Sequence, residues 1–280
     1  MKKQQVILVC GAIVLLSVLY FFGRTLPINK PAIIAANKPP DSAFDINTLL
    51  DASKKQLSTE QQAYVGQLER SVVRGNVKDQ QTTIYNQLAA FYKDTAHLLL
   101  PFAYYTGLAA KLENSEKSLT FAARFFLESV RSQENPSLKM WMANESKELF
   151  EKALVINPGN DSSKVGLGSC YLFGNISDNP MQGITMIRDV VARDPENMYA
   201  QYMLGMGALL SGQLDRAIER LSVVASKQPD NIEVQLILAE TFERKGSKAE
   251  AAKWYEMVKS RVNNPEVVKE IDDRLRLLKK

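Results

Sequence analysis

The sequence predicts an all-α protein: a solenoid of stacked helix pairs, closed by a C-terminal helix and preceded by one membrane-spanning helix. Three observations support this fold class. From about Asp45 onward, apolar residues recur at three- and four-residue spacing, and strand-like alternation is absent. Pro158, Pro195 and Pro229 follow one another at intervals of 37 and 34 residues, and a period of this length is typical of arrays of helix pairs. The first forty residues contain one long uncharged apolar run.

Residues 1–24 are predicted to form a membrane anchor. The run from Val6 to Phe22 has 17 residues and no charge, and as a helix it would be about 25 Å long, at the short end of what spans a bilayer. Lys2 and Lys3 precede it, and aromatic rings at its far end suit the membrane interface. A cleaved signal peptide is the alternative, but bulky rings stand where small residues should precede a cleavage site.

The charges beside this run predict its orientation. Lys2 and Lys3 favour a cytoplasmic N-terminus, whereas Arg24, Lys30 and Lys38 favour the reverse with a weight that falls with distance. We therefore predict a single-pass protein of a bacterial inner membrane, anchored through residues 6–22, with its folded domain in the periplasm. Residues 25–44 are predicted to be a linker, because its prolines block helix and sheet and favour extended chain.

One repeat unit stands out between Met198 and Asn231. Numbered from Met198, positions 7, 8, 11, 20, 24, 27 and 32 hold Leu204, Gly205, Ala208, Ala217, Leu221, Val224 and Pro229. Small residues at positions 8 and 20 let two antiparallel helices approach closely, larger apolar residues fill the gap to the next unit, and the proline stops the second helix. This pattern resembles the tetratricopeptide repeat (TPR).

The resemblance implies a right-handed α-solenoid of TPR helix pairs over residues 158–263. In the unit that begins at Asp161, the same positions from 7 to 27 hold Leu167, Gly168, Tyr171, Gly183, Ile187 and Val190, with three extra residues in the turn "FGNISDNP". In the unit that begins at Ile232, they hold Leu238, Ala239, Phe242, Ala251, Tyr255 and Val258. The stretch around Cys170 is therefore interpreted as a helix followed by a long turn rather than as a catalytic loop.

The regions on either side of these units are also predicted to be helical. Residues 45–157 are interpreted as degenerate TPR-like repeats, because Phe150, Ala153 and Pro158 fit positions 24, 27 and 32. A helical adaptor is the alternative for this region, and the sequence leaves its helix pairing open. Residues 264–280 are predicted to form a capping helix, with Asn264 as N-cap and Pro265 at the first helical position.

In TPR arrays, the first helices of successive units line a concave groove, and the resemblance implies that positions 2, 5, 9, 12 and 13 face inward. The predicted partner-binding residues at such positions are Val165, Ser169, Leu172, Phe173, Tyr199, Tyr202, Met206, Leu209, Leu236, Glu240 and Glu243. Position 5 holds Val165, Tyr202 and Leu236, so the Lys, Arg and Asn clamp of chaperone adaptors is missing. An apolar, aromatic groove with acidity at one end suits an apolar protein or peptide partner. Packing against the chain's own upstream helices is the alternative.

Charge and motifs argue against nucleic-acid binding and catalysis. Five of the 35 basic residues and none of the 31 acidic residues lie in residues 1–40, so the rest of the chain is nearly neutral and has no electrostatic footprint for a polyanion. The single histidine, His97, has apolar neighbours, and neither GxxxxGK[ST] nor GxSxG occurs. The sequence therefore predicts no catalytic site, no cofactor and no metal site.

These observations together predict a membrane-anchored TPR scaffold or adaptor that mediates protein–protein interaction in bacterial envelope protein assembly, secretion or maturation. One alternative is a TPR assembly regulator or receptor that faces the cytoplasm. Another is an enzyme whose catalytic region lies in residues 45–157, although no motif there supports it.

If the orientation is as predicted, protease added to intact spheroplasts will digest the domain from Asp41 to Lys280. Immunoblotting follows the digestion, and lysed cells serve as the control. Protection of the domain until lysis would place it in the cytoplasm and contradict the predicted orientation.

Overall fold

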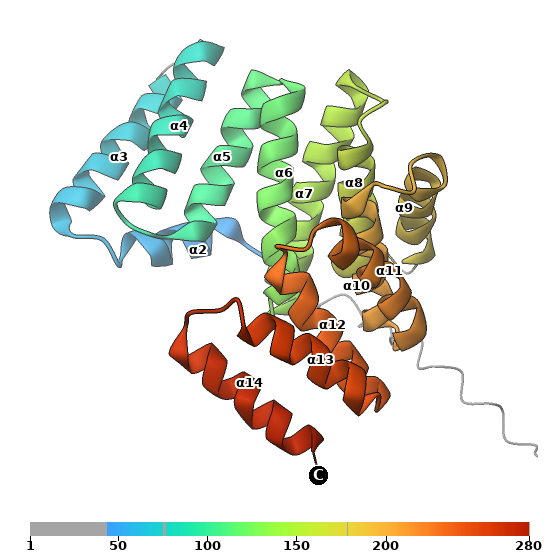
Figure 1. Ribbon diagram of the computed structural model, residues 1–280. Helices are drawn as coiled ribbons and strands as arrows, with labels where there is room; N and C mark the ends of the chain where they lie inside the picture. Colours follow the sequence, from blue (N-terminus) through green and yellow to red (C-terminus); the bar gives the residue numbers. More distant parts are fainter. Residues whose placement is uncertain (1–43, 75–76, 178, 280) are drawn as a thin grey trace, which may run out of the picture. The chain divides into compact units, whose positions relative to one another are not determined.

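The computed structural model describes residues 44–74, 77–177 and 179–279 (Figure 1). Every regular element in these ranges is an α-helix. The helices are α2 Ile46–Lys54, α3 Thr59–Arg74, α4 Lys78–Asp94, α5 Leu99–Glu113, α6 Glu116–Ser132, α7 Pro136–Ile156, α8 Asp161–Phe173, α9 Met181–Arg193, α10 Met198–Leu210, α11 Leu214–Lys227, α12 Ile232–Lys245, α13 Lys248–Lys259 and α14 Pro265–Leu278. The predicted anchor lies outside the described residues, as does the predicted linker except for Phe44. None of the helices named above combines the length and the apolar character needed to cross a bilayer.

The helices pack in consecutive pairs. α4 packs on α5, α6 on α7, α8 on α9, α10 on α11, and α12 on α13, while α14 packs on α13. Neighbouring pairs are joined by contacts such as α7 with α8 and α11 with α12, and the first helices α6, α8 and α10 also touch in sequence. The prediction of an all-α solenoid of TPR-like helix pairs is thus confirmed for the described part of the chain. The structure also gives the pairing that the sequence left open between residues 45 and 157.

An asparagine begins the first helix of three successive pairs. The tripeptide Pro-x-Asn recurs at residues 158–160, 195–197 and 229–231. The side chains of Asn160, Asn197 and Asn231 accept hydrogen bonds from the backbone N–H three residues on, at 2.9, 3.0 and 3.2 Å. Because proline ends the preceding helix and asparagine satisfies a free N–H of the next, this tripeptide sets the boundaries between pairs.

The helices α8 and α9 touch through their backbones at Gly168 and Gly183. A Cβ atom on Gly183 would lie 2.2 Å from the Gly168 carbonyl oxygen, and one on Gly168 would lie 2.7 Å from the Gly183 carbonyl oxygen. Both distances are far below van der Waals contact, so only glycine fits at either position without moving the helices apart. The predicted packing role of positions 8 and 20 is confirmed for this pair.

The stretch that resembles a catalytic loop is part of the core and its adjoining turn. Between α8 and α9, the described residues 174–177 and 179–180 are non-helical, as predicted, whereas Phe173, the first residue of the predicted turn, ends α8. Cys170 on α8 is buried, with its Sγ 3.2 Å from the Ser146 Oγ. Burial raises the pKa of the Cys170 thiol to about 12. The thiol is therefore protonated at neutral pH and unlike the thiolate of a nucleophilic cysteine.

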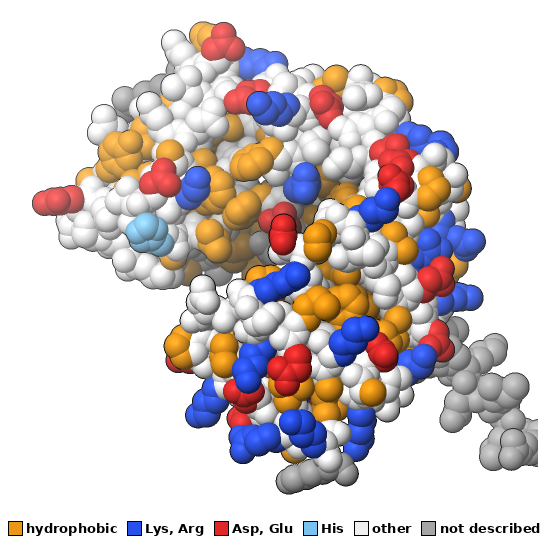
Figure 2. Space-filling model, in the orientation of Figure 1, with side chains coloured by type: hydrophobic (Ala, Val, Ile, Leu, Met, Phe, Trp, Pro, Cys, Tyr) orange, Lys and Arg blue, Asp and Glu red, His pale blue; other side chains and the backbone are white. Residues whose placement is uncertain are grey.

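The hydrophobic core follows the stack of helices. Its largest cluster joins buried residues of α5 through α10, and smaller clusters lie among α2 to α5 and among α10 to α14. Trp141 packs edge-on against Phe126 at 5.7 Å between ring centroids, and Trp254 is half-buried in the C-terminal clusters, as predicted. Apolar side chains also reach the surface among charged ones on the face shown in Figure 2.

Replacing Gly183 with alanine should lower the free energy of unfolding by about 2 kcal/mol, because the new methyl group overpacks the contact with the Gly168 carbonyl. Urea denaturation followed by circular dichroism measures the change. Gly66→Ala on α3 is the matched control, since its Cβ would meet only the Arg70 guanidinium at 3.5 Å. Alanine there should leave stability unchanged or raise it by about 0.5–1 kcal/mol. Equal effects of the two substitutions would contradict the packing role.

Candidate partner-binding groove

A cleft of about 680 Å³ lies between the first helices α6, α10 and α12. It is lined by Arg124, Leu127, Glu128, Arg131, Ser132, Tyr199, Tyr202, Met203, Met206 and Glu233. Tyr199, Tyr202 and Met206 are among the predicted partner-binding residues. The structure therefore brings the central part of the predicted groove together, and adds a second wall from α6.

The spacing of residues on two helices explains these walls. On α10, Tyr199, Tyr202 and Met206 follow one another at three and four residues, which places them on one face of the helix. On α6, Arg124 and Arg131 are seven residues apart and share a face in the same way. Because α6 and α10 both pack on α8, the two faces border the same cleft.

A hydrogen-bonded chain of three side chains crosses the cleft. The Arg131 guanidinium donates to the Tyr202 hydroxyl oxygen at 2.8 Å, and that hydroxyl donates to the Glu233 Oε1 at 2.7 Å. The same guanidinium lies 5.2 Å from the centroid of the Tyr202 ring and 3.9 Å from the Glu233 carboxylate. This chain connects α6, α10 and α12, and combines a cation–π contact with charge-assisted hydrogen bonds.

The two tyrosines of the cleft are neutral over the physiological pH range. Burial, together with the hydrogen bond to Glu233, raises the pKa of Tyr202 to about 12. Burial also raises the pKa of Tyr199, whose ring lies 5.4 Å from the Arg124 guanidinium carbon. The cleft thus presents neutral aromatic and thioether surface, and its charged lining consists of two arginines, Arg124 and Arg131, and two carboxylates, Glu128 and Glu233.

Four of the predicted groove residues lie in the core. Val165 and Ser169 have no exposed surface, and Leu172 and Phe173 are only 7% and 8% exposed. Their helix α8 is packed between α6 and α10, which cover its side chains. For these four positions the structure shows packing against the chain's own helices, the alternative that the sequence left open.

The predicted residues farther along the chain contact the C-terminal helices. Leu209 and Leu236 are half-buried against the C-terminal core clusters. The Glu243 carboxylate accepts hydrogen bonds from the Tyr255 hydroxyl at 2.7 Å and from the Arg274 guanidinium of α14 at 3.4 Å. Burial raises the pKa of Glu240. None of these four residues lines the cleft between α6, α10 and α12.

Sequence reasoning misses the α6 wall of the cleft. The repeat register of residues 45–157 cannot be assigned from the sequence, so it gives no inward-facing positions for Arg124, Leu127, Glu128 or Arg131. The signal that could have found them is the spacing of the two arginines, which matches the spacing of the aromatic face on α10.

The comparison with protein families agrees with the geometry. Residues 177–232 and 202–265 each match a family model described as tetratricopeptide repeat, and together they cover α9 to α13. The prediction of tetratricopeptide repeats is therefore confirmed over this part of the chain. No curated protein matches the sequence.

Several solved structures are similar to this chain at low sequence identity. The thermophilic TPR protein TTC0263 of Thermus thermophilus aligns with a TM-score of 0.50 and 16% identity, over 71% of this chain and 99% of that one. MamA of Desulfovibrio magneticus RS-1 gives a TM-score of 0.44 and 18% identity, over 64% and 93%. YrrB, described as a TPR protein with an unusual peptide-binding site, gives 0.43 and 15%, over 74% and 97%. At such identities the likeness to TTC0263 shows the fold alone.

The substitution Tyr202→Phe keeps the ring beside Arg131 and removes the hydroxyl that connects α6 to α12. We expect the free energy of unfolding at neutral pH to fall by about 1 kcal/mol. The pKa of about 12 in the folded state exceeds the ordinary tyrosine value of 10.0, so the parent should lose stability as the pH rises from 10 to 12. The variant should lose less over that interval.

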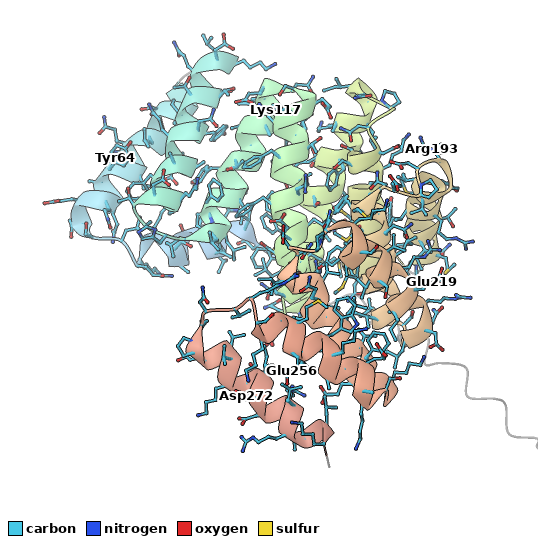
Figure 3. All side chains as sticks on the ribbon, in the orientation of Figure 1. Tyr64, Lys117, Arg193, Glu219, Glu256 and Asp272 are labelled. Carbon is cyan, nitrogen blue, oxygen red and sulfur yellow. The ribbon has the colours of Figure 1, made fainter. Side chains whose placement is uncertain are left out.

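Urea denaturation at pH 7, 10 and 12 measures both effects. Tyr64→Phe is the control, because Tyr64 on α3 (Figure 3) is 44% exposed and phenylalanine keeps its ring contact with Phe91 of α4, at 5.5 Å between centroids. A control that behaves like Tyr202→Phe would contradict the role of the hydrogen-bonded chain.

Proposed function

We propose that this protein is a membrane-anchored TPR scaffold that holds a protein partner in the cleft between α6, α10 and α12. The observation that carries the proposal is the composition of that cleft, in which Tyr199, Tyr202 and Met206 face Arg124 and Arg131. Tyrosine, methionine and arginine are enriched at protein–protein interfaces, and tyrosine and arginine are frequent among the residues that supply most of the binding energy there.

The cleft suits an extended peptide segment with apolar side chains. Met206 offers an apolar contact that adapts to different shapes, because the methionine side chain is flexible, and the buried Leu127 and Met203 lie beneath it in the cleft lining. Arg124 and Arg131 offer donors for carbonyl or carboxylate oxygens of the same segment. The site therefore combines an apolar anchor with polar groups that orient the partner.

The proposed place of action is the periplasmic face of a bacterial inner membrane. The apolar run of residues 6–22 would anchor the chain, and Lys2 and Lys3 would keep its N-terminus in the cytoplasm. A scaffold in this position would serve envelope protein assembly, secretion or maturation. A cytoplasmic domain would instead serve assembly regulation or reception, and the spheroplast experiment distinguishes the two.

Crosslinking in the membrane tests the cleft. A photo-reactive amino acid in place of Ser132, at the edge of the cleft, should form a discrete adduct with the partner when the full chain is expressed in its host. The double variant Tyr202→Asp, Met206→Asp should reduce that adduct about tenfold or more, because two charges then replace the apolar contact surface.

The matched control places the same two charges elsewhere. Val155 and Ile156 on α7 are 83% and 45% exposed, so Val155→Asp, Ile156→Asp also converts two apolar residues to acids. This control should keep the adduct. Equal adduct from the two double variants, with both folded by circular dichroism, would refute the proposed use of the cleft.

A further inference from the structure

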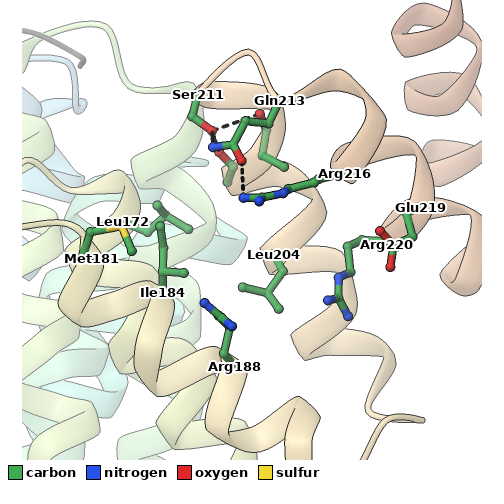
Figure 4. Close-up of a pocket in the computed structure, with 12 residues that line it drawn as sticks. Leu172, Met181, Ile184, Arg188, Leu204, Ser211, Gln213, Arg216, Glu219 and Arg220 are labelled. Carbon is green, nitrogen blue, oxygen red and sulfur yellow. Dashed lines mark hydrogen bonds between the residues drawn. The ribbon is translucent and has the colours of Figure 1, made fainter. Parts of the chain in front are cut away.

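A second pocket lies on the opposite side of α10 from the cleft. Its volume is about 340 Å³, and it is bordered by α9 and α11, which both pack on α10 (Figure 4). The contributions of α10 are Leu204, Gly207 and Ala208, whereas the cleft uses Tyr202 and Met206 of the same helix. At about 100° per residue these two sets lie on different faces of α10, so the two sites are separate.

The floor of this pocket is apolar. Leu172 of α8, Ile184 of α9 and Leu204 of α10 line it. Gly207 is part of the same wall, and a Cβ atom on it would lie 2.7 Å from the Leu172 side chain. The glycine thus lets Leu172 reach the floor beneath α10.

Three arginines stand around this floor. Arg188 comes from α9, and Arg216 and Arg220 come from α11. The Arg216 guanidinium donates to the Gln213 side-chain oxygen at 2.6 Å, and Arg220 donates to the Gln201 side-chain oxygen at 2.9 Å. These amide acceptors orient the guanidinium groups without neutralising their charge.

The charge of these arginines is not balanced within the described residues. No carboxylate oxygen of residues 44–74, 77–177 or 179–279 lies within 4.0 Å of the Arg188, Arg216 or Arg220 side-chain nitrogens. Arg193, on the same helix as Arg188, shows the contrast, because its guanidinium pairs with the Asp161 carboxylate at 2.7 Å. Glu219 is the single acidic residue in the pocket wall.

We propose that this pocket binds an acidic peptide segment of a partner protein, in which one apolar side chain stands between carboxylate side chains. The apolar side chain would cover Leu172, Ile184 and Leu204, and the carboxylates would pair with the surrounding guanidinium groups. Arginine suits this role, because its planar fork bonds a carboxylate through two parallel hydrogen bonds. The chain's own residues 1–40 contain no acidic residue and cannot supply such a segment.

This inference goes beyond the proposed function, because it assigns a second site that does not depend on the cleft. A nucleic acid could pair with the arginines through its phosphates, but that pairing would not require an apolar side chain in the ligand. The dependence of binding on the apolar side chain therefore separates a peptide ligand from a general polyanion.

Fluorescence anisotropy with the full chain in mild detergent tests the proposal. The probe is a fluorescein-labelled, C-terminally amidated peptide in which one leucine stands between two pairs of acidic residues. We expect saturable binding that weakens about tenfold or more in the double variant Arg188→Gln, Arg216→Gln, because two charge-assisted contacts are lost. Arg220 is left in place because it bonds the buried Gln201.

Two matched controls make the result specific. Lys248→Gln, Lys253→Gln on α13 removes the same charge outside the pocket and should leave probe binding unchanged. A probe with alanine in place of leucine, and one with amides in place of the acids, should each bind about tenfold more weakly. Absence of binding, equal binding by the arginine and lysine variants, or equal binding of the alanine probe would each overturn the proposal.

The cleft variant Tyr202→Asp, Met206→Asp should bind the probe as the parent does. If this variant loses the crosslink from position 132 but still binds the probe, the cleft and the second pocket are independent sites. Failure of the cleft experiment alone would refute the proposed function, but it would not affect the proposal that the second pocket binds an acidic peptide.

Discussion

The close approach of α8 and α9 at Gly168 and Gly183 is the constraint on which the surfaces of this protein depend. Direct backbone contact brings the second helix of the pair close enough for α10 to pack on both α8 and α9. With α6 on its other side, α8 is then almost fully covered. The surfaces left for partners are consequently formed mainly by the helices around α8, and α8 itself contributes only Leu172, at the floor of the pocket between α9, α10 and α11.

The helix α10 has a distinct role on each of its faces. Tyr202 and Met206 face the cleft shared with α6, while Leu204 and Ala208 face the pocket shared with α9 and α11. The sequence of α10 is apolar nearly all round, which is usual for a helix that contacts neighbours on every side. Apolar residues such as Tyr202, Leu204 and Met206 remain half-buried on this helix, because its neighbours cover them only in part.

The sequence allows much of the helical fold to be predicted, because the signals that define a pair are local. Proline, asparagine and small residues mark the ends and the contact points of α8 to α13, and the structure has them in those places. The groove is harder to predict. Val165 and Ser169 occupy inward positions of the repeat, but whether such a position is open depends on how closely α6 and α10 approach. That distance is a tertiary property, and the register of α6 is not readable from its sequence.

The hydrogen-bonded chain of Arg131, Tyr202 and Glu233 has a consequence for cooperativity. In a simple repeat array, each helix pair contacts only the adjacent pairs. The free energy of unfolding is then nearly the sum of the contributions of single pairs and of the interfaces between neighbours. Here, side chains of α6, α10 and α12 share hydrogen bonds across the intervening pair α8 and α9. If α12 detaches, the Tyr202 hydroxyl loses its acceptor, the Glu233 carboxylate. The position of the Arg131 guanidinium, which donates to the same hydroxyl, is then less well fixed. The free energies of these pairs are therefore not additive, and a ligand that competes for either charged group acts on all three helices at once.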